Sequence, residues 1–308
     1  MKRFFFCYII LLFCSCQDDL IEGVTVIDLG QSGDFTDICI TNQNEIIALG
    51  GHPWEFSFLA SSTDNGDHWQ VDSLTDKILF DIDAFNSDLY SGGLDGQIHQ
   101  KTDNQWNFIR TTEWGFIKGL QVLPDQSIIT LGGHAYRLGF INKINTDQSI
   151  ERLYTEDIEF SDIEITPNGN LVAAAYGKIL YSQDEGRTWL ISNGTGDFFK
   201  DLVLMNDAIL AIGNNGLILR SFDQGLSWEP SRKLGDVARS DRLQKGVYLG
   251  DDVIWVVGRS GLVVISEDAG NTWAESRIDT SFDLTAIEKT DSNVFVGGTD
   301  GFFCVINR

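Results

Sequence analysis

The chain is 308 residues long and carries 45 Asp and Glu residues against 22 Lys and Arg residues, a net charge of −23 at pH 7. A surface this acidic repels polyanions, so we expect no nucleic-acid partner and no attraction to anionic lipid headgroups. Neutral or basic partners remain open.

The first residues have the pattern of an export signal. Lys2 and Arg3 precede an apolar run at 4–14, which has the length of a signal-peptide core and is too short to span a bilayer as a permanent helix. The run ends in Phe-Cys-Ser-Cys, which resembles a bacterial lipobox and implies that Cys16 is diacylated and becomes the first residue. We therefore predict a lipoprotein signal peptide at 1–15, with a plain secretory signal as the alternative.

The residues after Cys16 bear on the compartment. Gln17, Asp18 and Asp19 resemble the acidic tag that directs some bacterial lipoproteins to the outer face of the outer membrane. We expect an exported, surface-facing outer-membrane lipoprotein that touches the membrane only through its lipid anchor, with residues 16–23 as lipidated cysteine and tether. Without the signal, 20 basic residues face 45 acidic ones, a net charge of −25.

A repeated motif runs through the rest of the chain. Four segments read Ser-x-Asp-x-Gly-x-x-Trp, at 62–69, 182–189, 221–228 and 266–273, and degenerate copies stand at 102–106 and 145–150. The copies recur about every 40 residues, a period typical of propeller blades. Each is preceded by short apolar runs broken by Asn, Asp and Gly, which predict antiparallel strands joined by hairpins.

The repeats predict an all-β fold. Inner strands are expected to begin near Asp37, Phe80, Lys118, Asp162, Asp201, Lys245 and Leu284, which gives a seven-bladed β-propeller over 24–308. The last repeat has three strands only, so the apolar run at 24–29 is expected to supply the fourth and to close the ring. An N-terminal closing strand pairs edges that would otherwise be templates for aggregation.

The repeated box has a structural explanation. Its Asp can accept backbone N–H groups of its own loop, its Gly can adopt positive φ, and its Trp can bury a large area against the neighbouring sheet. We therefore expect no catalytic role for these residues. The structural positions are Asp64, Gly66, Trp69, Asp184, Gly186, Trp189, Asp223, Gly225, Trp228, Asp268, Gly270 and Trp273.

Two cysteines remain in the body of the chain. Cys39 and Cys304 both lie in apolar, strand-like runs. The favoured interpretation is a pair of buried free thiols, and a disulfide tying the first blade to the last is the alternative.

The box resembles the BNR or Asp-box repeat of sialidases and related propellers. The longer unit, apolar-Gly-x-x-Gly-apolar followed by the box, is similar to propellers of the photosystem II stability and assembly factor-like group, over nearly all of 24–308. The resemblance implies a scaffold for protein partners, which understood members bind through a basic patch, and this chain has no comparable run of Lys or Arg. A sialidase would imply three arginines on one face, for which only Arg137, Arg242 and Arg259 are candidates, and the Arg-Ile-Pro signature is absent.

Two loops stand out by their length and composition. Segments 49–59 and 131–141 read Leu-Gly-Gly-His followed by aromatic residues, whereas the corresponding turns of other repeats are shorter. Aromatic residues on longer loops are common ligand contacts. The candidate binding residues are His52, Trp54, Trp114, His134, Tyr136 and Arg137.

Alternatives stay open at this site. Trp54 and Tyr136 could simply plug the channel mouth or pack between blades. His52 and His134 lack further ligands at recognisable spacing, so we expect no metal and no cofactor.

An aromatic residue and an aspartate recur at the inner-strand entrances. We expect the aromatic rings to pack between blades and the carboxylates to line the channel rim in solvated structural roles, although a ring of acids could hold a cation or a basic peptide. The pairs are Phe35/Asp37, Phe80/Asp81, Phe160/Asp162, Phe199/Asp201 and Phe282/Asp283.

The leading hypothesis is a non-catalytic scaffold that binds a protein or glycan. A sialidase-type glycoside hydrolase is the alternative, and a purely structural lipoprotein subunit of a larger envelope complex is a third possibility.

Overall fold

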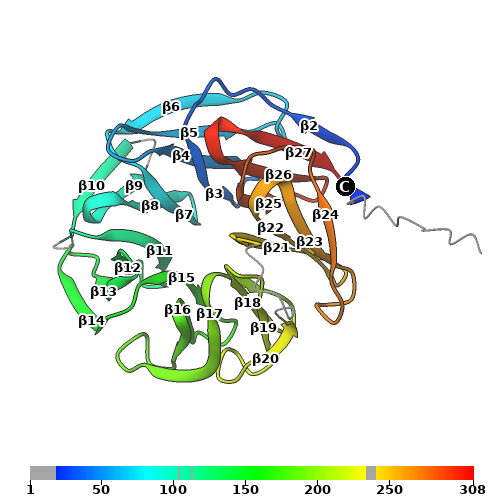
Figure 1. Cartoon of the computed structure of the whole chain (residues 1–308). Helices are drawn as coiled ribbons and strands as arrows, with labels where there is room; N and C mark the ends of the chain where they lie inside the picture. Colours follow the sequence, from blue (N-terminus) through cyan, green and yellow to red (C-terminus); the bar gives the residue numbers. More distant parts are fainter. Residues whose placement is uncertain (1–18, 103–104, 112–113, 234–240) are drawn as a thin grey trace, which may run out of the picture.

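The structure is a computed structural model that describes residues 19–102, 105–111, 114–233 and 241–308. The predicted signal peptide and Cys16 therefore lie outside the described residues. The strands form sheets arranged in a ring around a central axis, as in a β-propeller (Figure 1). In the described part of the chain, no helix is long and apolar enough to cross a membrane.

Four sheets have four strands each. The first three follow chain order, and the fourth combines both ends of the described chain. Their strands are β3 (Asp34–Ile40), β4 (Ile46–His52), β5 (Phe56–Ser62) and β6 (Gln70–Thr75); β7 (Leu79–Phe85), β8 (Asp88–Gly93), β9 (Gln97–Thr102) and β10 (Gln105–Arg110); β11 (Phe116–Val122), β12 (Ile128–His134), β13 (Arg137–Ile144) and β14 (Ile150–Glu156); and β2 (Val24–Val26), β25 (Leu284–Lys289), β26 (Asn293–Gly298) and β27 (Phe303–Asn307).

Two sheets are larger. A five-stranded sheet runs β1-β24-β23-β22-β21, and a six-stranded sheet runs from β15 to β20 in chain order. Their strands are β1 (Asp19–Leu20), β21 (Lys245–Gly250), β22 (Val253–Val257), β23 (Leu262–Ser266) and β24 (Ala274–Arg277); and β15 (Phe160–Ile165), β16 (Leu171–Ser182), β17 (Leu190–Leu204), β18 (Ile209–Gly213), β19 (Ile218–Ser221) and β20 (Glu229–Arg232).

The prediction of a seven-bladed ring is wrong. The strands of the described residues form six hydrogen-bonded sheets, so the propeller has six blades. The reason lies in the fourth and fifth sequence repeats, which share the six-stranded sheet. The first half of β16 pairs with β15 and its second half pairs with β17, while the second half of β17 pairs with β18. A hydrophobic cluster that includes Val172, Ile179, Phe199 and Leu202 packs between the two halves of this sheet.

The two ends of the described chain meet at one part of the ring. β2 pairs antiparallel with β27 at the position expected for an N-terminal closing strand, with Val24 opposite Ile306. Ahead of it, β1 pairs in parallel with β24, with Asp19 opposite Ser276. The expected tether thus includes a short strand, which adds a fifth strand to the neighbouring sheet.

The Asp boxes form nearly identical turns. In the first box, the Ser62 hydroxyl donates to Asp64 Oδ1 at 2.9 Å, and the backbone N–H of His68 donates to the same oxygen at 2.9 Å. Gly66 N donates to Ser62 Oγ at 2.9 Å, with Gly66 at a φ of 94° that other residues rarely adopt. The same three bonds recur at 2.8–2.9 Å in the boxes of Asp184, Asp223 and Asp268.

The box tryptophans differ in burial. Trp228 is only 6% exposed, and its indole N–H donates to the Gly225 carbonyl at 2.9 Å. Trp69, Trp189 and Trp273 are half-buried. Trp69 packs on Phe303 and Phe295 of the closing sheet, with ring centroids 5.1 and 6.1 Å away, so the box also joins the first blade to the last.

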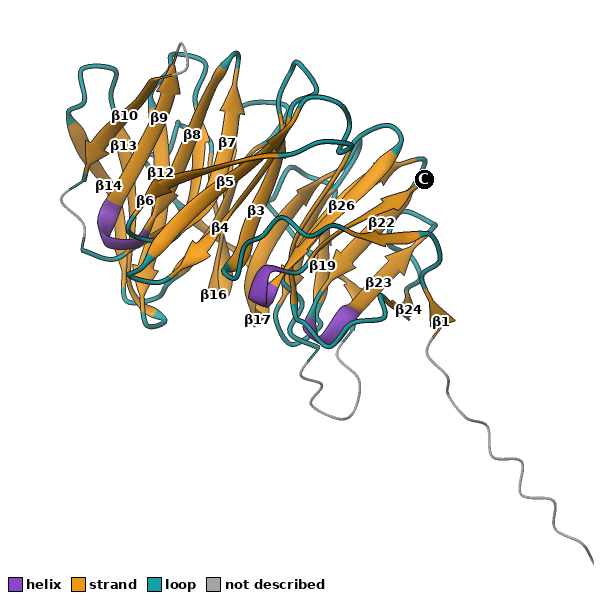
Figure 2. Cartoon of the chain, turned by 90° about the horizontal axis from the view of Figure 1, so that it is seen from above, coloured by secondary structure: helices purple, strands orange, loops and turns teal. Residues whose placement is uncertain are grey.

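One face of the ring bears the beginnings of the inner strands and the turns between second and third strands. Asp34 at the start of β3 lies opposite Gly51 near the end of β4, and Phe116 at the start of β11 lies opposite Gly133 near the end of β12. We call this the mouth face. The short 3-10 turns η1 (Leu94–Gly96), η2 (Arg259–Gly261) and η3 (Thr299–Gly301) lie along this edge of the ring (Figure 2).

Candidate functional site

Four inner-strand aspartates hold neighbouring inner strands together. Each follows a β-bulge, or lies at one, and its carboxylate accepts a backbone N–H from the next inner strand at 2.7–3.0 Å. The pairs are Asp37 with Ile82, Asp81 with Leu120, Asp162 with Leu202 and Asp201 with Gly246. Asp37 and Asp201 are each 4% exposed and Asp81 is 9% exposed, so the expectation of solvated carboxylates at the rim is corrected for these three residues, which are buried in the channel wall.

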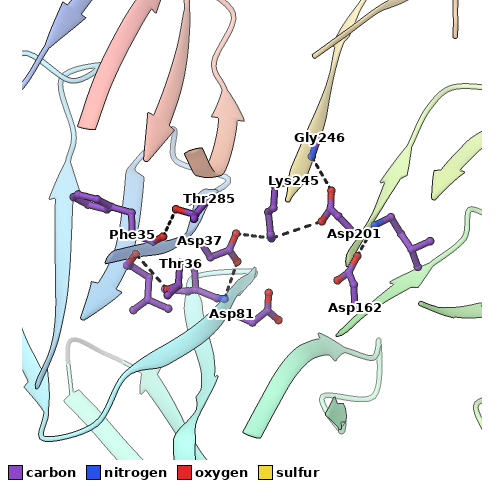
Figure 3. A network of polar contacts seen from close by, with 12 residues as sticks. Phe35, Thr36, Asp37, Asp81, Asp162, Asp201, Lys245, Gly246 and Thr285 are labelled. Atoms are coloured by element: carbon purple, nitrogen blue, oxygen red, sulfur yellow. Dashed lines mark hydrogen bonds and ion pairs between the residues drawn. The ribbon is translucent and has the colours of Figure 1, made fainter. Parts of the chain in front are cut away.

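A cavity of about 330 Å³ lies inside this wall. Its polar lining consists mainly of carboxylates, together with one lysine. Lys245 Nζ lies 2.6 Å from Asp37 Oδ1 and 3.9 Å from Asp201 Oδ1 (Figure 3). The acids of the lining are Asp37, Asp81, Asp83, Asp162, Glu164, Asp201 and Glu288.

The burial of so many acids shifts their protonation. Burial raises the pKa of Asp162 to about 6 and the pKa of Glu288 to about 7, and it raises the pKa of Glu164 well above its ordinary value. Burial alone would lower the pKa of Lys245, but the surrounding carboxylates, Asp37 first, raise it well above the usual value. The interior of the channel is therefore an acidic environment organised around one ammonium group.

Among the residues that the structure describes, no group of three or more His, Cys, Asp or Glu side chains is arranged to hold a metal ion. The hypothesis of a cation bound by the acidic ring therefore receives no geometric support.

The mouth face has a second cavity of about 300 Å³ with the opposite charge. Lys118, Lys200 and Lys245 all line it, and Asp34 is the acidic residue of its lining. Lys245 lines both this cavity and the acidic one, so its side chain stands at the boundary between a basic mouth and an acidic interior.

Exposed aromatic rings lie in the same region. Tyr136, Tyr176 and Phe198 contact one another, with ring centroids 5.4–5.7 Å apart. Tyr136 is 59% exposed and Tyr176 is 49% exposed, whereas Phe198 is buried. Lys200 Nζ, which lines the mouth cavity, lies 4.8 Å from the centroid of the Phe198 ring. We call Tyr136, Tyr176 and Phe198 the aromatic triad.

A second row of rings flanks the mouth. Phe80, which lines the mouth cavity, lies 5.6 Å from Phe116, and Phe116 lies 5.1 Å from His134 between ring centroids. Lys118 Nζ lies 5.8 Å from the Phe116 ring. Aromatic and basic side chains from several strands thus lie together at the mouth.

The predicted binding residues divide into two groups. The structure places Tyr136 in the aromatic triad and His134 in the flanking row. The others have local partners: Trp54 lies under Lys77, Trp114 lies under Arg110, His52 faces Glu55, and Arg137 is paired with Asp157 at 2.7 Å. Trp54 is 63% exposed, and Tyr136, although 59% exposed, contacts Tyr176 and Phe198 of the neighbouring sheet.

Sequence reasoning missed Tyr176, Phe198, Lys118, Lys200 and Glu159. A signal was present, because the residue at the inner-strand bulge faces the mouth in several repeats. Aligned at that position, the repeats carry Thr36, Phe80, Lys118, Ser161, Lys200, Lys245 and Thr285, all of which line the mouth cavity.

The fold and the repeated box define the class: the chain is a β-propeller similar to the BNR type. The family model described as photosynthesis system II assembly factor YCF48 matches residues 200–290. Comparison with curated proteins finds no significant match.

Solved structures extend the similarity over the whole ring. YCF48 from Cyanidioschyzon merolae has 14% sequence identity, covers 92% of this chain and 98% of its own, and superposes with a TM-score of 0.70. YCF48 bound to D1 peptide has 16% identity, 94% and 99% coverage, and a TM-score of 0.72. Virginiamycin B lyase from Staphylococcus aureus has 12% identity, 92% and 99% coverage, and a TM-score of 0.76. Identities this low show a shared fold and leave function to the site.

Proposed function

We propose that the chain is an exported lipoprotein whose propeller binds a segment of a partner protein on the mouth face and acts as a non-catalytic assembly scaffold. The observation that carries the proposal is the aromatic triad, three rings in mutual contact, of which Tyr136 and Tyr176 remain exposed beside a cavity lined by lysines. Clustered exposed aromatic rings typically mark interaction sites, and Tyr is enriched among residues that dominate binding energy. A relative of the same fold, YCF48, has been solved bound to D1 peptide, which supports a peptide-type ligand.

The geometry does not favour the sialidase alternative. Arg137 is 69% exposed in its side chain and is paired with Asp157. The acidic cavity and the mouth cavity are lined by none of the three candidate arginines, Arg137, Arg242 and Arg259. A carboxylate clamp of three arginines around a central substrate would require them to converge there.

A photo-cross-linking experiment tests the binding face. A soluble form starting at Leu20 carries a benzoylphenylalanine at position 136, 176 or 108 and is irradiated in an extract of the source cells. Phe108 is the control because it is 54% exposed but lies on the outer strand β10. We expect one discrete protein adduct at positions 136 and 176 and none at 108. A glycan ligand would give no protein adduct, and equal labelling at all three positions would contradict a specific face.

The lipid anchor needs its own test. Metabolic labelling of the full chain with a tagged fatty acid should label the wild type, and Cys16→Ser should abolish the label and release the propeller from the membrane fraction. Labelling that persists in Cys16→Ser would contradict the anchor without affecting the binding proposal.

A further inference from the structure

The mouth cavity is a basic island in an acidic protein. Its lining contains three lysines and one aspartate, and the carboxylate of that aspartate, Asp34, accepts the backbone N–H of Asp300 at 3.0 Å. The chain as a whole has a net charge of −23. Three ammonium groups therefore gather at one cavity of a strongly acidic protein.

Two of the three lysines already have carboxylate partners. Lys245 is bound to Asp37 at 2.6 Å, and Lys118 forms an ion pair with Glu159. Glu159 is only 2% exposed, and its other carboxylate oxygen accepts the backbone N–H of Tyr136 at 2.5 Å. Glu159 therefore ties the mouth lysine Lys118 to the loop that carries Tyr136 of the aromatic triad.

Lys200 differs from its two neighbours. Within the described ranges of the chain, no hydrogen bond or ion pair engages its ammonium group, which lies over the Phe198 ring at 4.8 Å. Burial and the nearby charge of Lys118 lower the pKa of Lys200 to about 8, against the opposing effect of Glu159. A partly buried ammonium group without an anion is costly, and an incoming anion would relieve that cost.

The hydroxyl groups of the cavity are committed to the wall. The hydroxyls of Thr36 and Thr285 donate to the backbone carbonyls of Leu79 and Phe35 at 2.8 and 2.6 Å, and the hydroxyl of Ser161 donates to the carbonyl of Phe199. Their protons are therefore not available to a ligand. Besides the neutral side-chain amide of Gln244, Lys200 is the donor that an anion entering this cavity can reach, and it is the charged one.

We propose that the mouth cavity is a carboxylate-binding subsite, in which Lys200 pairs with an acidic side chain or C-terminal carboxylate of the bound partner segment while the aromatic triad packs on the residue next to it. This inference rests on the proposed function, because the segment that carries the carboxylate is the one held on the mouth face. A charge-assisted bond between an ammonium group and a carboxylate in a partly buried site is stronger than a neutral hydrogen bond.

Two short peptides test the subsite directly. Protein with 13C-methylated lysines is titrated with acetyl-Phe-Glu-Glu and with the neutral analogue acetyl-Phe-Gln-Gln amide. We expect the acidic peptide to shift the Lys200 resonance saturably and to raise the pKa of Lys200, while the neutral analogue binds about tenfold more weakly or worse. Lys101, which lies on β9 away from the mouth cavity, should show no saturable shift.

Substitutions separate this claim from the proposed function. Lys200→Gln should lose the preference for the acidic peptide, Lys200→Arg should keep it, and Lys101→Gln should behave like the wild type; thermal melting confirms that each variant folds. If Lys200→Gln keeps the preference, or if neither peptide binds below about 1 mM, the carboxylate subsite is refuted. If both peptides bind equally and Tyr176→Ala weakens both, the subsite is refuted and the aromatic binding face stands.

Discussion

Lys245 Nζ lies 2.6 Å from Asp37 Oδ1, although the two residues are 208 positions apart in the sequence. The contact joins β21 to β3 and bridges β25, which packs between them. Asp37 also accepts the N–H of Ile82 on β7, so one carboxylate connects three parts of the inner wall. The lysine thus neutralises part of a carboxylate ring that the fold itself brings together.

Lys245→Met is expected to destabilise the propeller. Removal of one partner from a buried ion pair leaves an uncompensated charge, which typically costs about 3–5 kcal/mol. The loss measured by urea unfolding should be largest at pH 7.5 and smaller at pH 5, because Asp162 and Glu288, with pKa values of about 6 and about 7, are then largely protonated. Lys101→Met is the control, and equal effects of the two substitutions would contradict this role.

The channel acids should also give the wild type an unusual pH dependence. The pKa of Glu288 is about 7 in the folded state, above its unfolded value of about 4, so the folded state binds the proton more tightly. Its stabilising contribution is complete below about pH 4 and is lost as the pH rises through about 7. Melting temperatures of Glu288→Gln should therefore fall less steeply over this window than those of the wild type. Glu267→Gln, at an exposed position, should leave the slope unchanged.

The repeated sequence predicted much of this architecture, because the box and its hairpins are local features. The number of sheets could not be predicted from these local features. In β16 and β17 the strands continue through Gly177 and Gly196, which have φ values of 85° and 113°, without a polar loop that would separate one sheet from the next. A sequence period counts repeats and does not fix which strands share hydrogen bonds.

The site was only partly predictable for a related reason. Tyr136 stands on a conspicuously long loop, so its sequence context marked it. Tyr176 and Phe198 lie in ordinary strand sequences, and only the curvature of the ring brings them to Tyr136. Likewise, Lys200 stands out because Lys118 and Lys245 each have a carboxylate partner. The sequence alone does not show which acids those partners are.

The box tryptophans should contribute unequally to stability. Trp228→Ala is expected to cost about 3–5 kcal/mol, since it removes a buried indole and its hydrogen bond to Gly225. Trp189→Ala should cost clearly less, because Trp189 is half-buried and its indole nitrogen has no hydrogen-bond partner in the described residues. Chemical unfolding of both variants gives the comparison. Equal losses of stability in the two variants would contradict the expectation that the more buried tryptophan contributes more.

The two cysteines should be unreactive in the folded protein. Both are free thiols in the structure. Burial raises the pKa of Cys304 to about 12, and burial together with the charge of Asp37 raises that of Cys39 well above its usual value, so little thiolate exists at pH 8. Iodoacetamide should label neither cysteine before denaturation and both afterwards. A mass lower by two hydrogen atoms, with no labelling after denaturation, would instead reveal a disulfide.

Binding at the mouth face is tested most directly by comparing substitutions of two exposed aromatic residues on different parts of the ring. Tyr176 belongs to the aromatic triad and is 49% exposed; Phe222 lies in the third intact Asp box, away from the mouth cavity, and is 59% exposed. With the partner segment identified by cross-linking, Tyr176→Ala should raise its dissociation constant about tenfold or more, and Phe222→Ala should leave it unchanged. A dissociation constant unaffected by Tyr176→Ala, or raised as much by Phe222→Ala, would contradict binding at the mouth face.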